Sequence, residues 1–205
     1  MAQTVPQWLQ GVLLNPGPGH AGLVVATLAN AGAVTAEMVG AGGFELTSAA
    51  FLHGEELDPS FTADEEDSVA PPLEWTAPPA GSQELVLVVE DPDAPGKVAC
   101  HWLVWGLAAQ RGKLLEGEVP PRVGKNAHGN SEWLLPAPPQ GDEPHDYVFQ
   151  LFALDQPLAL MPGASREDLV KAMTGHVSAV AILTGTYARE EADEDWENWE
   201  AEDAD

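Results

Sequence analysis

Two carboxylates stand in a stiff turn at residues 91–95, which have the sequence Asp-Pro-Asp-Ala-Pro. A proline ring fixes its own backbone angle φ, so Pro92 and Pro95 restrict where Asp91 and Asp93 can lie. Carboxylates held in this way can orient an imidazole or accept hydrogen bonds from backbone N–H groups. The second use is common in turns, so this motif alone leaves open a purely structural role.

A histidine opens one apolar stretch of the chain, and a histidine with a tyrosine opens another. His101 precedes residues 102–107, and His145 and Tyr147 precede residues 148–154. Side chains two positions apart on a strand point to the same face, so His145 and Tyr147 share one. An imidazole and a phenol can both donate hydrogen bonds to one anion, although a structural pair in a core would show the same spacing.

A carboxylate close to these imidazoles would favour their protonated form and fix their orientation. A protonated histidine donates charge-assisted hydrogen bonds, each worth about 1.5–3 kcal/mol when partly buried. By the two-residue period, His101 is expected to share a face with Leu103 and Trp105 and to point away from Cys100. A nucleophilic dyad of Cys100 and His101 is therefore not expected.

These side chains must be positioned by strands. Residues 84–90 are almost continuously apolar, which is typical of a central buried strand. Residues 55–72 and 108–144 are rich in turn formers and are predicted to be loops, and a capped helix is predicted to begin at Ser165. The pattern predicts a mostly β chain folded as an antiparallel β-sandwich with a C-terminal helix. Its strands are predicted at residues 44–48, 84–90, 101–107, 147–154 and 180–187.

Both ends of the chain differ from its centre. Residues 1–43 are predicted to form an N-terminal helical extension, because residues 8–13 have helical spacing and residues 23–38 form a second apolar run. This extension could pack on the main domain, residues 44–189, or pair two chains in a homodimer. Residues 190–205 hold ten acidic residues and no base, so we expect a disordered acidic tail.

The overall charge excludes several classes of partner. The chain has 205 residues, with 33 Asp and Glu against 8 Lys and Arg, and a formal net charge of −25. Such a charge repels nucleic acids and anionic membrane faces at long range. No base precedes Lys97, so no secretory signal is expected, and no apolar run there is long enough to span a bilayer. The single cysteine fits a reducing compartment, and we expect a cytoplasmic protein without stable membrane insertion.

Taken in chain order, these motifs resemble one family. They are Asp-Pro-Asp-Ala-Pro at 91–95, His-Trp at 101–102, Pro-Pro-x-Gly at 138–141 and His-x-Tyr at 145–147. Further similarities lie at 44–51, 153–155 and 175–187. The chain resembles the phosphatidylethanolamine-binding protein (PEBP) family, in its bacterial Raf kinase inhibitor-like branch, over about residues 44–189.

The resemblance implies a β-sandwich with a small anion pocket at one end of its sheets. Its members bind phosphate, small carboxylates or phospholipid head groups, and some inhibit kinases or proteases. By matching motif positions, the expected ligand-binding residues here are Asp91, Asp93, Pro95, His101, His145 and Tyr147.

Three departures from the family pattern concern this pocket. Asp146 replaces a basic residue within the usual His-Arg-Tyr, which reverses a charge. Leu134 and Leu135 stand where small residues are common, so the mouth is expected to be narrower. The usual Asn-x-Ser-Pro element ahead of the strand is replaced here by Asp-Ser-Val-Ala-Pro at residues 67–71.

Three functions remain open from the sequence. The first is a non-enzymatic binding protein for a small anion, with no cofactor and no metal. The second is a hydrolase or lyase in which a histidine acts as general base and Asp91 orients it. The third is a protein-interaction module that uses the acidic tail. A metal site at Asp91, His101 and His145 is possible on residue type but fits the resemblance less well.

Overall fold

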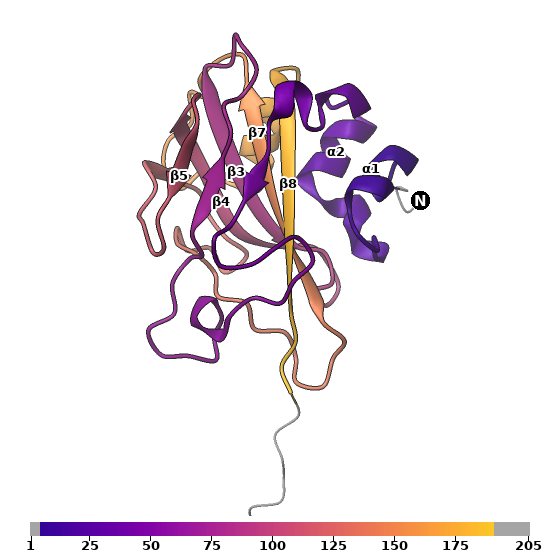
Figure 1. Cartoon of the computed structure of the whole chain (residues 1–205), viewed down its shortest axis with the longest axis vertical. Coiled ribbons are helices and arrows are strands. Elements are labelled where there is room, and N and C mark those ends of the chain that lie inside the picture. Colours follow the sequence, from indigo (N-terminus) through magenta and orange to yellow (C-terminus); the bar gives the residue numbers. More distant parts are fainter. Residues whose placement is uncertain (1–4, 191–205) are drawn as a thin grey trace, which may run out of the picture.

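Five strands form the larger of two sheets in the computed structural model, which describes residues 5–190. The strand order is β6-β4-β3-β7-β8, and all neighbours are antiparallel (Figure 1). The long members are β3 (Glu84–Asp91), β4 (Ala99–Ala108), β7 (His145–Leu154) and β8 (Val177–Tyr187). Every residue of β3 is buried, because this strand lies in the middle of the sheet with both faces covered. The four long strands expected from the sequence are confirmed.

A second sheet of three short strands covers one face of the first. It consists of β1 (Leu46–Thr47), β2 (Leu73–Trp75) and β5 (Gly112–Leu114), in the order β1-β2-β5. Phe44, Leu46, Leu73 and Trp75 pack with the inward side chains of the larger sheet in one apolar cluster. The mostly β, antiparallel sandwich is therefore confirmed. Two short strands, β5 and β6 (Arg122–Val123), lie within residues 108–144, which were predicted to be loops.

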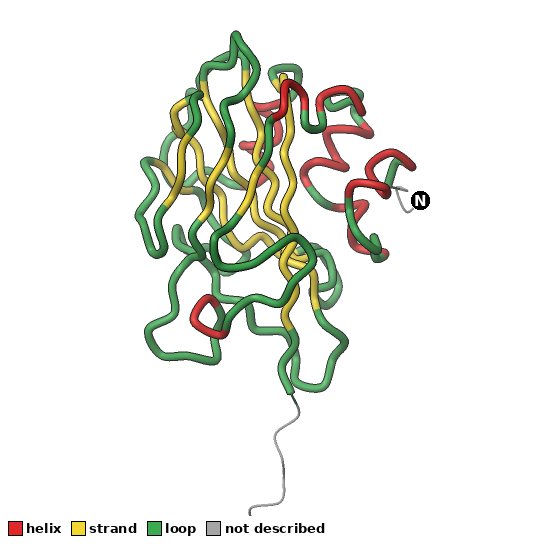
Figure 2. Tube along the Cα trace, in the orientation of Figure 1, coloured by secondary structure: helices red, strands yellow, loops and turns green. Residues whose placement is uncertain are grey.

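Helices cover the other face of the larger sheet, as Figure 2 shows in red. Two come from the N-terminal extension, α1 (Gln7–Val12) and α2 (Val24–Asn30), and the third is α3 (Arg166–Met173). The second predicted helix ends early because Gly32 takes a positive φ of 72°. Ser165 caps α3 in a capping box with Asp168, as predicted. Four short 3-10 helices complete residues 5–190: η1 (Pro18–Gly22), η2 (Ala36–Met38), η3 (Ala41–Gly43) and η4 (Pro59–Phe61).

The extension is part of the same hydrophobic core as the sheet. Leu9, Leu23, Val25 and Leu28 are fully buried in one cluster with side chains of β3, β4, β7 and β8. These apolar side chains motivated the expectation of a homodimer, and here they are buried within a single chain. The extension therefore packs on its own main domain, which was the other arrangement expected from the sequence.

A buried polar network anchors α2 to the sheet. The Glu90 carboxylate, with no exposed side-chain surface, accepts hydrogen bonds from Val24 N at 2.7 Å, Gln150 Nε2 at 2.8 Å and Arg166 Nε at 2.5 Å. Gln150 Oε1 in turn accepts from Val25 N at 2.8 Å. An unpaired carboxylate buried at this position would be strongly destabilising. The three hydrogen-bond donors compensate the cost of burying the charge of Glu90.

No helix within residues 5–190 is long and apolar enough to cross a membrane. The acidic tail and its two tryptophans, Trp196 and Trp199, lie outside the described residues apart from Glu190.

Candidate functional site

A cavity of about 170 Å³ opens where the end of β3 and the starts of β4 and β7 meet neighbouring loops. Five of the six residues expected at a ligand site line it: Asp91, Pro95, His101, His145 and Tyr147. The volume is several times that of a water molecule and well below that of a drug-sized ligand site. The cavity therefore suits a small ion or one head group.

Asp91, the last residue of β3, holds the cavity's first imidazole. Its Oδ2 atom lies 2.8 Å from His145 Nδ1, and its Oδ1 atom accepts a hydrogen bond from Asp93 N at 2.8 Å. Asp91 and His145 are each about 95% buried. An ionised carboxylate can only accept hydrogen bonds, so the Nδ1 atom of His145 carries the proton. One side chain thus fixes both the acidic turn and the orientation of His145.

Asp93 does not line the cavity, unlike the other five expected residues. Its Oδ2 atom accepts a hydrogen bond from Asp146 N at 2.9 Å. This bond ties the acidic turn to the first residues of β7. Asp93 therefore positions the residues that surround the cavity rather than facing a ligand.

His101 reaches the cavity because of a β-bulge. Val89 pairs with Trp102 and Glu90 with Cys100, so His101 is left without a partner across the ladder. The bulge turns His101 away from Leu103 and toward the ring of Tyr147, with centroids 5.1 Å apart and the rings perpendicular. The expectation that His101 shares a face with Leu103 and Trp105 is therefore wrong. Cys100 does face the opposite side, among the helices.

A backbone carbonyl fixes the ring of His101. Its Nδ1 atom lies 2.6 Å from the oxygen of Leu134, and a carbonyl can only accept, so Nδ1 is again the protonated nitrogen. Both imidazoles thus use Nδ1 for a hydrogen bond within the protein. No described residue makes a hydrogen bond to the Nε2 atom of either ring. Each Nε2 presents a lone pair when the ring is neutral and a donor when the ring is protonated.

Burial sets the protonation of these groups. Desolvation lowers the pKa of His101 below its ordinary 6.5 and outweighs the bond to Leu134 O and the charge of Asp91, which both raise it. The charge of Asp91 alone therefore does not keep this imidazole protonated. Burial also raises the pKa of Tyr147, so the phenol stays neutral. Its hydroxyl is fully buried and has no hydrogen-bond partner among the described residues.

The rim of the cavity is apolar. Leu134, Leu135, Pro138 and Pro139 line it, so the two leucines that depart from the family pattern do face the cavity. His128, to which the sequence assigned no role, also lines the cavity. Its only signal was its place in a glycine-rich loop. The leucines continue into an apolar groove of about 650 Å³ that includes Trp102 and Trp133.

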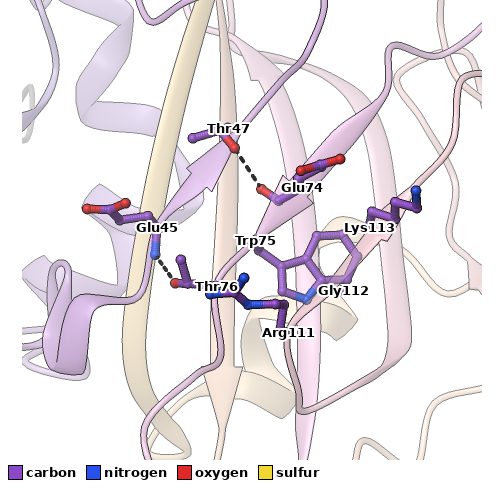
Figure 3. A pocket seen from close by; sticks show the side chains of 8 residues that line it. All are labelled: Glu45, Thr47, Glu74, Trp75, Thr76, Arg111, Gly112 and Lys113. Atoms are coloured by element: carbon purple, nitrogen blue, oxygen red, sulfur yellow. Dashed lines mark hydrogen bonds between the residues drawn. The ribbon is translucent and has the colours of Figure 1, made fainter.

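A second depression, of about 400 Å³, lies over the smaller sheet. Its charged side chains do not converge: in Figure 3, Glu45 and Lys113 point to opposite sides of the Trp75 ring. Thr47 Oγ1 and Thr76 Oγ1 are already bonded to the backbone of neighbouring strands. This depression has no unpartnered buried polar group aimed into it among the described residues and is not a candidate site.

The described residues contain no group of three or more His, Cys, Asp or Glu side chains close enough together to hold a metal ion.

The chain is similar to known proteins over its sandwich. A model of the phosphatidylethanolamine-binding protein family matches residues 47–188. A UPF0098 protein of Methanothermobacter thermautotrophicus is 38% identical over 154 residues, which is 70% of this chain and 98% of the relative.

Two solved structures share the fold. A PEBP homologue of Chlamydia trachomatis, CT736, is 35% identical, with a TM-score of 0.67, and covers 73% of this chain and 98% of its own. YbcL of E. coli, described as a new member of the mammalian PEBP family, is 29% identical, with a TM-score of 0.65, and covers 72% of this chain and 99% of its own. The chain therefore belongs to the phosphatidylethanolamine-binding protein family.

Proposed function

We propose that this protein is a non-enzymatic binding protein whose cavity takes one small anion: phosphate, a carboxylate, or the phosphate of a head group. The observation that carries the proposal is the set of unused hydrogen-bonding groups in the cavity. The Nε2 atoms of His101 and His145 and the hydroxyl of Tyr147 have no hydrogen-bond partner among the described residues, while both Nδ1 atoms are bonded to the protein. Asp142 Oδ2 lies 4.0 Å from His145 Nε2, beyond hydrogen-bond distance. An oxyanion would accept hydrogen bonds from all three once the imidazoles are protonated.

Membership of the family supports a binding role, and the size of the cavity supports a small ligand. A regulatory role toward a kinase or protease, which the resemblance implies, would act through the surface around the occupied cavity. The net charge of −25 opposes the approach of anions, so we expect weak, millimolar binding.

Titration with inorganic phosphate, followed by NMR of the histidine rings, tests this function. We expect the ring protons of His101 and His145 to shift together with one dissociation constant. The rings of His53 and His176 do not line the cavity and serve as internal controls. The absence of any response from His101 and His145 at tens of millimolar phosphate would refute the function.

Anion binding should depend on pH because His101 must gain a proton to donate from Nε2. Its pKa is lowered by burial, so the neutral ring dominates at pH 7. Above that pKa, each unit of pH should raise the dissociation constant for sulfate at least about tenfold, because binding takes up a proton on His101. Sulfate is the appropriate probe because its own charge is constant over this range. A sulfate affinity that is flat from about pH 5 to pH 8 would contradict this expectation.

The same shift affects the stability of the unliganded protein. Since folding lowers the pKa of His101, the unfolded chain takes up the proton first. This contribution is therefore present above pH 6.5, the ordinary imidazole pKa, and is lost as the pH falls from there through the lowered pKa of the folded state. A bound anion opposes the loss by favouring the protonated ring.

A hydrolase or lyase is the alternative supported by one distance, the 2.8 Å between Asp91 Oδ2 and His145 Nδ1. An imidazole oriented by a carboxylate is the arrangement that a general base needs. The residues that line the cavity include no serine, threonine or cysteine, so the nucleophile would have to be water or the substrate. Turnover of a phosphoester or ester that is lost in His145→Ala would favour this alternative.

A further inference from the structure

The N-terminal extension touches the outer side of the turn that carries Asp91. The contact is closest at η1, where a Cβ on Gly19 would stand 1.6 Å from the backbone oxygen of Pro92. No side chain fits there, so the two backbones lie directly against each other. At the ends of this segment, a Cβ on Gly17 would meet Asp93 Oδ1 at 2.9 Å, and one on Gly22 would meet Val98 Cγ2 at 2.7 Å. Residues 17–22 therefore lie against Pro92 and Asp93 of the acidic turn and against Val98 beyond it.

A histidine of the extension reaches β7 from the same segment. His20 is 99% buried, and its Nε2 atom lies 3.2 Å from Asp146 Oδ2. Its Nδ1 atom lies 3.2 Å from the oxygen of Gly17, which holds the ring within η1. Asp146 is the residue that replaces a base of the family pattern, and it directly follows His145. The extension thus places a ring nitrogen in close contact with this reversed charge, at a geometry that does not make a hydrogen bond.

These contacts continue into the cavity through the backbone N–H groups of Asp146 and Asp93 and the carboxylates of Asp93 and Asp91. Asp146 N donates to Asp93 Oδ2, Asp93 N donates to Asp91 Oδ1, and Asp91 Oδ2 holds His145 Nδ1. The other side of the same strand end is held as well, because Glu90 binds the first turn of α2 and Arg166 Nη2 donates to the oxygen of Gly22 at 2.6 Å. The end of β3 is therefore fixed from both sides by residues 17–25.

We propose that residues 17–22 of the extension are a positioning element of the anion site, with His20 as a positioning residue that acts through Asp146 and the acidic turn on His145. The family model matches residues 47–188, so this element lies outside the part of the chain that the model matches. The inference rests on the proposed function where it is tested by phosphate affinity. It does not rest on that function where it is tested by the protonation of the His145 ring nitrogens. Without the contact, the turn would lose its outer support and Asp91 its fixed distance to His145.

Two substitutions in the full-length chain test the element. His20→Gln removes the ring that faces Asp146, and Gly19→Ala forces the extension off Pro92. In both variants we expect the Nδ1-protonated form of His145 to lose its dominance in long-range proton–nitrogen NMR spectra. We also expect the dissociation constant for phosphate to rise about tenfold, as when one charge-assisted hydrogen bond is lost.

A core substitution in the same extension is the matched control. Leu9 is fully buried in α1, and Leu9→Ala should lower the melting temperature as any large-to-small core change does. Leu9 packs in the apolar cluster between the helices and the larger sheet, so the His145 spectrum should be unchanged and the phosphate constant should stay within about twofold. A merely structural role of the extension would make all three variants behave alike.

The outcomes separate this inference from the proposed function. If the wild-type protein binds no phosphate, the function fails, and the ring-nitrogen spectrum of His145 still decides the positioning role. If His20→Gln folds and leaves both the spectrum and the phosphate constant unchanged, the inference is overturned, whatever Gly19→Ala does.

Discussion

Replacing His145 with alanine should weaken phosphate binding by about a hundredfold. The substitution removes one donor to the anion, worth about 1.5–3 kcal/mol when charged. It also leaves the Asp91 carboxylate, 96% buried, facing the cavity without its partner. A buried negative charge repels an anion at short range, so the two effects add in the same direction. The loss is measured from the response of the His101 ring to phosphate.

The matched control is His176→Ala. His176 lies on the surface, 3.0 Å from Asp155 Oδ1, and does not line the cavity. Its loss should leave the phosphate constant within about twofold of the wild-type value. A second variant, Asp91→Ala with His145→Ala, removes the stranded charge and should bind more strongly than His145→Ala alone. If His145→Ala binds phosphate as well as the wild type, the anion does not occupy this cavity.

Replacing Arg166 with methionine should lower the free energy of unfolding by about 3 kcal/mol. Arg166 neutralises Glu90, which has no exposed side-chain surface, and removing one partner of a buried ion pair leaves an uncompensated charge. Arg166 itself is 24% exposed, which places the loss at the lower end of the range for buried pairs. Methionine retains much of the apolar stem, so the change reports on charge more than on packing. Urea denaturation provides the measurement.

Lys171→Met on the same helix controls for the loss of a cation. Lys171 is exposed, and its removal should change the free energy of unfolding by less than about 0.5 kcal/mol. Adding Glu90→Gln to Arg166→Met removes the buried charge and should recover part of the loss. A loss below about 1 kcal/mol for Arg166→Met would show that Glu90 does not need this partner. The hydrogen bonds from Val24 N and Gln150 Nε2 would then be enough to compensate the buried carboxylate.

The sequence alone determined the fold and most members of the candidate site. Continuous apolar runs mark the central strands because both faces of the sheet are covered, and this pattern is local. The cap at Ser165 is local too, since its four residues contain both halves of the capping box. The ordered motifs then indicated the family, and the family identified five of the residues that line the cavity.

Only the tertiary structure determined the orientation of His101 and the contacts between segments far apart in the chain. The bulge at His101 adds one residue to β4 and reverses which face that side chain takes, and no two-residue alternation contains such a step. The role of Asp93 and the close packing of Gly19 on Pro92 depend on segments that are far apart in the chain. The same holds for His20, whose buried contact with Asp146 spans more than a hundred residues. Local sequence fixes the period of an element, whereas contacts across such separations are set by how complete elements pack together.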